Sequence, residues 1–364
     1  MVKDFFKLFV KYIVYNSKAL FLFLLKNTEF DIDKTKPLFI THDLGGGTEN
    51  YISQNNFSDY VILRKMGVGK DWIYKITQNN SSKFIVKNDL FCEISGFNSY
   101  FVNSLVSFSE KKKILMFFIN EKTSKNFKLT YAIHDFDCLC ENNFNLIRND
   151  SYCELNCTNC RKNNPYHNHI WFDFLNCCDE IRCFSESSKK LILKKYKMLD
   201  SNKITVVPHN TDYCQKYKPI VLNNDELHIG FVGNCNNIPK GKKIVVPFLK
   251  FAKQKNIKVS VIGKFNLKNK VFSKNIKYLG KYEKSELGEI LEREGVNVIF
   301  FTSICPETFS YLISELITLD IPICAFNIGA QGEKIQKYEL GYLMKLGNSA
   351  EMYMQILDFW RKLI

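Results

Sequence analysis

The chain has 364 residues, of which 46% are hydrophobic and 14% aromatic. This composition excludes a disordered or fibrous protein, and the length suits two domains that each bury a core. The net charge of +14 favours anionic partners: phosphate-bearing substrates, an anionic membrane face or nucleic acid. Nucleic acid is the second choice, because the lysines are scattered along the chain. The 13 cysteines include adjacent Cys177 and Cys178 and favour a reducing, cytoplasmic compartment over a disulfide framework.

Residues 1–36 are expected to form an N-terminal amphipathic helical segment. Within residues 1–27, Lys3, Lys7 and Lys11 share one helical face and apolar residues fill the remainder. No small-residue cleavage site follows, as a signal peptide requires, and no run reaches the eighteen or so apolar residues that span a bilayer. Two interpretations stay open: a helix on an anionic membrane surface, which makes the protein peripheral on the inner face, or a helix packed on the first domain.

The first domain is predicted to span residues 37–210. It opens with a strand over 38–41, a glycine turn over 45–47 and a helix from Thr48. Gly46 and Gly47 let the backbone approach a ligand closely, and a helix start favours phosphate. The alternative is a plain flexible turn. The glycines lack the spacing of a dinucleotide-binding fingerprint, which argues against a nicotinamide cofactor.

Between residues 59 and 130 the pattern predicts strands and turns. The segments YVILRK, DWIYKIT, KFIVKN and KKILMFFIN are interpreted as strands, and Phe101–Phe108 as the end of a helix. The segment GVGK at 67–70 lacks the spacing of a phosphate-binding loop and is interpreted as a hairpin turn.

Tyr131–Ile133 is predicted to end a strand, which places His134 and Asp135 at its carboxyl end, where open α/β sheets bind ligands. A lone histidine at such a place is more often structural. A cysteine-rich insertion follows over 138–165. Cys140, Cys153, Cys157 and Cys160 have the number and spacing of a tetrahedral structural zinc site, with Cys138 as a substitute for Cys140. The alternative is a set of reduced thiols.

A helix at 171–178, a strand–turn–helix from Glu180 and a last strand from Lys203 complete this domain, and residues 211–225 form the predicted linker. The second domain, 226–345, is expected to begin with a strand at 228–232 and a helix from Lys242. Lys240, in the loop between them, suits a phosphate; the alternative is a solvated surface lysine. Further strands in KVSVIG, IKYLG, NVIFFT and IPICAF, with helices between them, predict a parallel sheet. Residues 346–364 form a C-terminal amphipathic helix.

The segment IFFTSICPETFSYLISE predicts a buried strand, a turn through Pro306 and a helix. Glu307 and Glu315 lie eight residues apart, on nearly one helical face and separated by about 12 Å of rise. That separation suits a long polar ligand, and backbone N–H groups around Phe309 and Ser310 favour a phosphate. The alternative is a surface helix with two solvated glutamates.

Several of these motifs resemble glycosyltransferase family 4, whose members have the GT-B fold: two Rossmann-like doubly wound domains facing a central cleft. The segments PETFSYLISE and IPICAFNIGAQGEKI resemble its donor-binding region and closing glycine loop, and HDLGGGTE its first-strand loop. IHDF with the cysteine-rich loop resembles a surface-polysaccharide branch. Gly233, Lys240 and Gly241 match a diphosphate-gripping loop, although Asn234 stands where the family has arginine.

The resemblance implies a retaining, metal-independent transfer of a sugar from a nucleotide-diphosphate donor to a glycan or lipid-linked acceptor, with no cofactor for catalysis. Under it, Glu307 and His134 contact the donor sugar and Glu315 the ribose. Gly46, Gly47, Asn234, Lys240, Phe309 and Ser310 line the rest of the donor site. Lys242 and Lys243 are the candidates to replace the charge of the missing arginine. In such proteins the last helix often returns to the first domain.

Two rival functions stay open. A GT-B protein that binds a sugar nucleotide without transferring it is consistent with Asn234. A zinc-containing nucleic-acid-binding protein would use the cysteine cluster and the positive charge, but it predicts clustered arginines and aromatic stacking positions.

Overall fold

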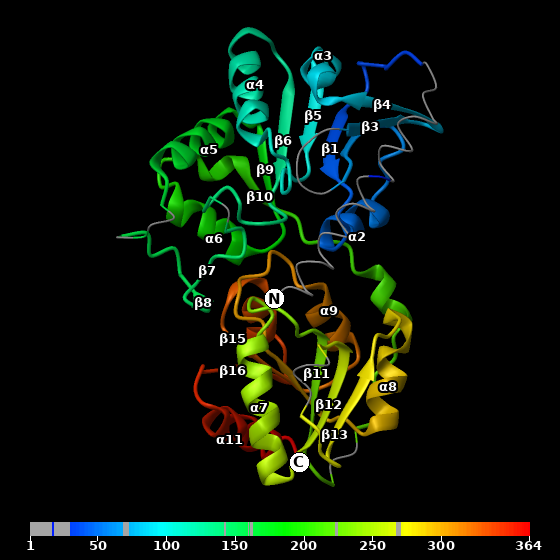
Figure 1. The fold of residues 1–364 in the computed structure, drawn as a ribbon, viewed down its shortest axis with the longest axis vertical. Helices are drawn as coiled ribbons and strands as arrows, with labels where there is room; N and C mark the ends of the chain where they lie inside the picture. Colours follow the sequence, from blue (N-terminus) through cyan, green and yellow to red (C-terminus); the bar gives the residue numbers. More distant parts are fainter. Residues whose placement is uncertain are drawn as a thin grey trace. The chain divides into compact units, whose positions relative to one another are not determined.

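The computed structural model describes residues 17, 30–67, 73–141, 143–158, 160, 163–222, 225–266 and 271–364. The proposed N-terminal amphipathic helix and the GVGK turn therefore fall almost wholly outside the described residues. The chain divides into two compact units (Figure 1). Unit 1 comprises residues 1–144, 157–184 and 189–208, and unit 2 comprises residues 145–156, 185–188 and 209–364.

Unit 1 is built on a sheet of eight strands in the order β10-β9-β6-β5-β1-β2-β3-β4. The six from β10 to β2 run parallel, and β3 and β4 add an antiparallel edge. Its strands are β1 (Leu38–His42), β2 (Val61–Lys65), β3 (Ile73–Gln78), β4 (Ser81–Val86), β5 (Ser99–Val102), β6 (Lys128–Ala132), β9 (Glu180–Cys183) and β10 (Ile204–Val206). Its helices are α2 (Gly47–Gln54), α3 (Leu90–Ile94), α4 (Lys111–Ser124) and α5 (Pro165–Cys177), and α6 (Glu186–Lys195) begins in the 185–188 segment.

Aromatic side chains form the core on both faces of this sheet. Tyr131 packs against Trp171 and Phe174 of α5, with centroids 5.4 Å apart in each pair. On the other face Phe39 stacks on Phe101 with centroids 5.1 Å apart. Successive side chains of a strand point to opposite faces of the sheet, so strands that are buried on both faces carry large apolar side chains at consecutive positions.

Two predictions in this unit are wrong. KKILMFFIN, interpreted as a strand, lies within helix α4, which buries Ile114, Leu115 and Phe118. The buried positions i, i+1 and i+4 fit a helix, but the continuous apolar run masked that period. Phe101–Phe108, interpreted as a helix end, instead contains the end of β5 and a loop, because Phe101 and Val102 pair with β6.

Unit 2 is built on a six-stranded parallel sheet in the order β13-β12-β11-β14-β15-β16. Its strands are β11 (His228–Asn234), β12 (Lys258–Lys264), β13 (Ile276–Gly280), β14 (Val298–Phe301), β15 (Ile323–Phe326) and β16 (Gly341–Met344), and a small hairpin pairs β7 (Ile147–Arg148) with β8 (Ser151–Tyr152). Its helices are α7 (Lys242–Lys255), α8 (Leu287–Glu294), α9 (Tyr311–Thr318), α10 (Gly329–Gln336) and α11 (Ser349–Arg361).

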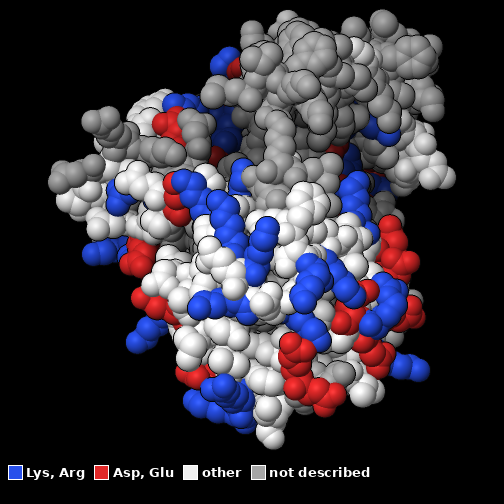
Figure 2. All heavy atoms as spheres, turned by 60° about the horizontal axis from the view of Figure 1, so that its bottom comes forward, with Lys and Arg blue, Asp and Glu red and all other residues white. Residues whose placement is uncertain are grey.

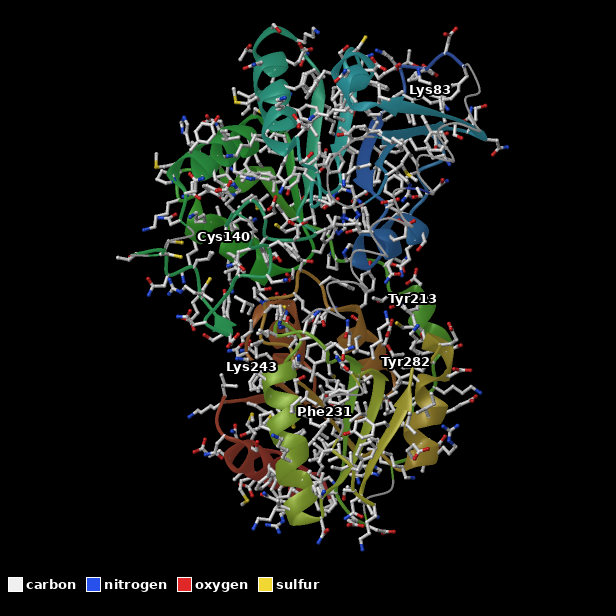
Figure 3. The ribbon with its side chains drawn as sticks, in the orientation of Figure 1. Lys83, Cys140, Tyr213, Phe231, Lys243 and Tyr282 are labelled. Atoms are coloured by element: carbon white, nitrogen blue, oxygen red, sulfur yellow. The ribbon has the colours of Figure 1, made fainter. Side chains whose placement is uncertain are left out.

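Helices cover both faces of this sheet, as alternate residues of each strand show. Phe231 and Phe300 point into a core shared with α7 and α11, in which Phe231 is labelled in Figure 3. Val232 and Ile299 point into a second core with α8, α9 and α10. Unit 2 is therefore a doubly wound α/β layer.

At the end of unit 2 one segment departs from the sequence interpretation, and the expected C-terminal helix is present. GAQGEKIQ, compared with a closing glycine loop, forms helix α10. Helix α11 buries Met352, Ile356 and Phe359 in the core beside α7, so unit 2 itself accounts for the apolar face of the C-terminal helix. Its start is fixed by a capping box between Asn348 and Glu351.

Candidate functional site

Two loops meet at the carboxyl edge of the sheet in unit 2. One follows β11 and ends at Gly241, and the other follows β14. Thr302 Oγ1 donates to the carbonyl of Lys240 at 3.0 Å, and the amide of Ile304 donates to the carbonyl of Pro239 at 2.9 Å. Gly241 has φ +88, and a Cβ there would lie 2.2 Å from the carbonyl oxygen of Thr302. Only glycine fits this close approach, which holds Lys240 beside the second loop.

Lys240 and Glu307 form an ion pair in this place. The carboxylate of Glu307 is largely buried, with 14% of its side chain exposed, whereas 41% of the lysine side chain is exposed. Burial alone would raise the pKa of Glu307, but the adjacent Lys240 ammonium lowers it below its usual value. Glu307 is therefore ionised at neutral pH, and the two partners are preorganised at the sheet edge.

Gln331 of α10 holds the backbone that carries Glu307. The buried amide of Gln331 accepts a hydrogen bond from the Glu307 N–H at 3.0 Å and donates to the carbonyl of Cys305 at 2.7 Å. The amide of Ala330 donates to the carbonyl of Glu307 at 2.9 Å. The glycine-containing α10 thus fixes the position of the Glu307 loop.

Glu315, on α9, is the second predicted carboxylate and is 4% exposed. It accepts a hydrogen bond from the Tyr213 hydroxyl at 2.7 Å, and the Lys284 ammonium lies 3.6 Å from the same carboxylate oxygen. The Lys284 ammonium also lies 5.2 Å from the centroid of the Tyr213 ring. Burial and the neighbouring Glu315 raise the pKa of Tyr213, so its hydroxyl remains a donor. Tyr213 and Tyr282 lie along the same side of unit 2 (Figure 3).

Phe309 and Ser310 immediately precede α9, which begins at Tyr311. Ser310 is the N-cap with φ 62, and its side chain makes no capping hydrogen bond. The buried ring of His209 stacks on Tyr311 with centroids 5.1 Å apart and meets Phe309 edge-on at 4.7 Å. Burial lowers the pKa of His209 to about 3, so this ring is neutral at physiological pH. The first turn of α9 is thus supported by aromatic packing.

Asn234, which stands in the place of the arginine, and Lys243, one of the two lysines considered to replace its charge, have other partners. Asn234 ends β11 as an exposed side chain, and its Oδ1 accepts from the amide of Asn236 at 3.2 Å. Lys243, labelled in Figure 3 near the start of α7, forms an ion pair with Asp150.

Gly46 and Gly47 lie at the carboxyl edge of the sheet in unit 1. Gly46, with φ 82, is the N-cap of α2, and a Cβ there would meet nothing within 4 Å. Before it, the amide of Leu44 donates to Nδ1 of His42 at 3.2 Å. Burial first, and the charge of Lys65 next, lower the pKa of His42 to about 4. Neutral His42 therefore shapes the glycine turn.

His134 lies near this edge and is tied to two neighbouring strands. Its Nε2 donates to Asn103 Oδ1 at 2.7 Å, and Asn103 Nδ2 donates to Thr41 Oγ1 at 3.3 Å. Its ring packs on Tyr51 and Phe184 with centroids 5.0 and 4.5 Å away. These hydrogen bonds and ring contacts orient the imidazole of His134, and neither of the two hydrogen bonds involves a charged side chain.

A cavity of about 450 Å³ opens in unit 1 between α4, α5 and the loop after β6. An ion pair of Lys111 with Asp137 lies in its wall, and Phe108 and Trp171 contribute apolar surface. The cavity therefore presents both charged and apolar groups to a ligand.

The four proposed zinc ligands are partly buried cysteines that form no disulfide. Cys153 belongs to a segment of unit 2, and the other three belong to unit 1. Within the described residues, no three His, Cys, Asp or Glu side chains form a group that could hold a metal ion. The zinc site therefore stays a prediction.

Several residues at these two edges were not predicted from the sequence. Gln331 and Lys334 lie within the segment interpreted as a glycine loop, and their positions depend on its forming a helix. Tyr213 lies in the predicted linker. The one usable signal was Asn103, a polar residue directly after the apolar strand SYFV, which ends at the same sheet edge as His134.

No protein-family model matches the chain, and no curated protein matches it by sequence. Solved structures do resemble it in fold. HepE from Anabaena in complex with UDP has a TM-score of 0.60 at 12% identity, over 90% of this chain and 91% of that one. Sucrose-phosphate synthase from Thermosynechococcus elongatus has a TM-score of 0.58 at 12% identity, over 90% of each chain. TarM from S. aureus has 0.51 at 15% identity, over 83% of this chain and 59% of that one.

Two Rossmann-like parallel sheets and these structural neighbours define the fold: the chain has the GT-B architecture of glycosyltransferases. Within the described part of the chain, no helix is long and apolar enough to span a bilayer.

Proposed function

We propose that the protein is a retaining glycosyltransferase that moves a sugar from a nucleoside-diphosphate donor to a hydroxyl of a glycan or lipid-linked acceptor in surface-polysaccharide synthesis. UDP is the first nucleotide to test, because HepE was crystallised with UDP and with UDP-glucose. One observation carries the proposal. A preorganised ion pair, a helix start and a second buried carboxylate gather at the carboxyl edge of one parallel sheet.

The transfer breaks the bond between the sugar and the diphosphate, and the diphosphate oxygen keeps the electron pair. The acceptor oxygen forms the new bond to the sugar, and the proton of its hydroxyl leaves with the departing diphosphate. Lys240 and the amide groups before α9 are placed to stabilise that negative charge. Glu307 is assigned to the donor sugar and Glu315 to the ribose, in agreement with the family resemblance. Metal-independent catalysis is proposed because the Lys240 ammonium takes the electrostatic role at the diphosphate.

Unit 1 is assigned to the sugar and the acceptor. His134 presents an oriented hydrogen-bonding group, and the 450 Å³ cavity has the size and mixed lining that suit part of a glycan. None of the 13 cysteines forms a disulfide, which is in line with the proposed reducing cytoplasm. Residues 1–27 remain the candidate for peripheral membrane contact, to be tested by deleting them and measuring partition onto anionic liposomes.

The test is transfer from a panel of UDP- and GDP-sugars to glycan and lipid-linked acceptors. Glu307→Gln should lower kcat by about a thousandfold, because it removes a charge placed for the transition state. Glu289→Gln is the matched control: it makes the same change on an exposed face of the same unit and should leave kcat unchanged. Equal activity of the two variants would refute the assignment of Glu307.

A second candidate is a donor-binding protein without transferase activity, favoured by Asn234 in the arginine position. Saturable binding of a UDP-sugar with neither transfer nor hydrolysis would support it. A nucleic-acid role has less support: on the face in Figure 2, basic side chains of the described residues stand among acidic and neutral ones. Binding of oligonucleotides with a steep salt dependence would revive that role.

A further inference from the structure

Lys334 of α10 extends under the first turn of α9. Its ammonium donates to the carbonyl of Ser310 at 3.2 Å and to the Ser314 hydroxyl at 2.5 Å. It also lies 3.4 Å from the centroid of the Phe309 ring. Lys334 therefore contacts the backbone and side chains that join Glu307 to Glu315.

The acidic groups that face this ammonium are each neutralised by another lysine. Within the described residues, Glu307 pairs with Lys240, Glu315 with Lys284 at 3.6 Å, and Glu333 with Lys337 at 3.4 Å. The remaining titratable neighbours are neutral at physiological pH: burial raises the pKa of the Cys214 thiol, and burial lowers the pKa of the His209 imidazole. The charges of these neighbouring groups sum to zero, so none of them compensates the positive charge of Lys334.

The position is unfavourable for a lone cation. A helix start carries a partial positive charge, and burial removes hydration from an ammonium. Consistent with this, burial lowers the pKa of Lys334 to about 7, against a smaller opposing effect of Glu307. An anion at the start of α9 would satisfy the helix amides and the ammonium together.

We propose that Lys334 is the second cation for the diphosphate of the donor, acting from beneath the first turn of α9 and supplying the charge that Asn234 does not. This inference rests on the proposed function. It assigns the charge to a residue of α10, whereas the sequence offered Lys242 and Lys243.

The first test uses the unmodified protein and calorimetric titration with UDP in buffers of different ionisation enthalpy. At pH 8 the terminal phosphate of UDP, with a second pKa of about 6, is already ionised. An arriving diphosphate should raise the pKa of Lys334, so binding should take up about one proton at pH 8. Binding with no proton uptake at pH 8 would overturn the inference while leaving the proposed function intact.

The second test compares Lys334→Met, Lys334→Arg and the exposed control Lys250→Met for binding of UDP and of uridine. Lys334→Met should weaken UDP binding about tenfold and abolish proton uptake, with uridine binding unchanged. Lys334→Arg should restore UDP affinity without proton uptake, and Lys250→Met should match the wild type. If Lys334→Met weakens UDP and uridine binding equally, its role is structural and the inference is wrong. If the wild type binds no nucleotide, both this inference and the proposed function fail.

Discussion

The carboxyl edges of the two parallel sheets are built from different chemistry. In unit 2 the edge carries ion pairs, with Lys240 on Glu307 and Lys284 near Glu315. In unit 1 the His134–Asn103 and His42–Leu44 hydrogen bonds use imidazole rings. The edge of unit 2 thus pairs its two candidate carboxylates with lysines, which suits a diphosphate. The edge of unit 1 also carries the ion pairs Arg64–Glu49 and Lys111–Asp137, but it adds imidazole and amide groups, which suit hydroxyl groups. The comparison teaches that the strand order places a site, whereas the side chains at the strand ends decide its ligand.

The largest expected effect comes from the tight approach of the two loops in unit 2. Gly241→Ala should destabilise the protein by on the order of 3 kcal/mol, because the new Cβ combines a strained φ with a backbone clash. Gly280→Ala is the control, since Gly280 also has positive φ, +77, but nothing lies within 4 Å of a Cβ there. Its cost should be about 1 kcal/mol. Urea unfolding measures the free energy of unfolding of both variants. Equal losses of stability would show that the two loops can move apart at Gly241 without destabilising the protein.

Removing the amide that supports Glu307 should have the next largest effect. Gln331→Leu leaves the Glu307 N–H and the Cys305 carbonyl without their buried partner, at a cost of about 2–3 kcal/mol. It should also lower kcat, because the Glu307 carboxylate is no longer held in place. Full kcat in a destabilised Gln331→Leu protein would show that Glu307 is positioned by Lys240 alone.

The imidazole at the unit 1 edge predicts a dependence of stability on pH. The pKa of His42 is lowered from 6.5 to about 4 in the folded protein, so the unfolded chain binds the proton more tightly. Stability should therefore fall as pH drops from about 6.5 towards 4, by on the order of 2 kcal/mol from this residue at pH 5.

Replacement of His42 by asparagine should flatten part of that slope when free energies of unfolding are compared at pH 5 and pH 7. His209, whose pKa is also lowered, contributes a similar slope from unit 2 and stays in both proteins. If the free energy of unfolding changes between pH 5 and pH 7 as much in His42→Asn as in the wild type, protonation of His42 does not destabilise the folded protein.

The smallest effect is expected at His134. His134→Ala should lower kcat/KM about tenfold, since it removes one proposed hydrogen bond to the sugar, and should leave UDP affinity unchanged. Asn103→Ala should reproduce part of this loss by releasing the imidazole ring. A loss of UDP affinity in His134→Ala would contradict the division between a charged edge and an imidazole edge.

Local patterns in the sequence were enough to predict the doubly wound sheets and to select the two main carboxylates as candidates. Glu307 and Glu315 were singled out because a buried strand, a proline turn and an apolar helix follow one another. The expectation that one helix carries both was wrong: Glu315 lies on α9, whereas Glu307 lies in the loop before it, because the helix begins only at Tyr311. The strand interpretation of KKILMFFIN failed because a run of apolar residues suits a buried strand and a buried helix equally. Only packing against α5 decides between them.

The sequence by itself determined the class of fold and the residues near the ends of the strands, because hydrophobic period and strand–turn–helix order are local properties. Only the tertiary structure decided that Gln331 supports the Glu307 loop, that Tyr213 holds Glu315 and that Lys334 lies beneath α9. These contacts join residues 20 to 102 positions apart. No local pattern encodes such pairs, because burial and charge balance arise only when the loops are brought together.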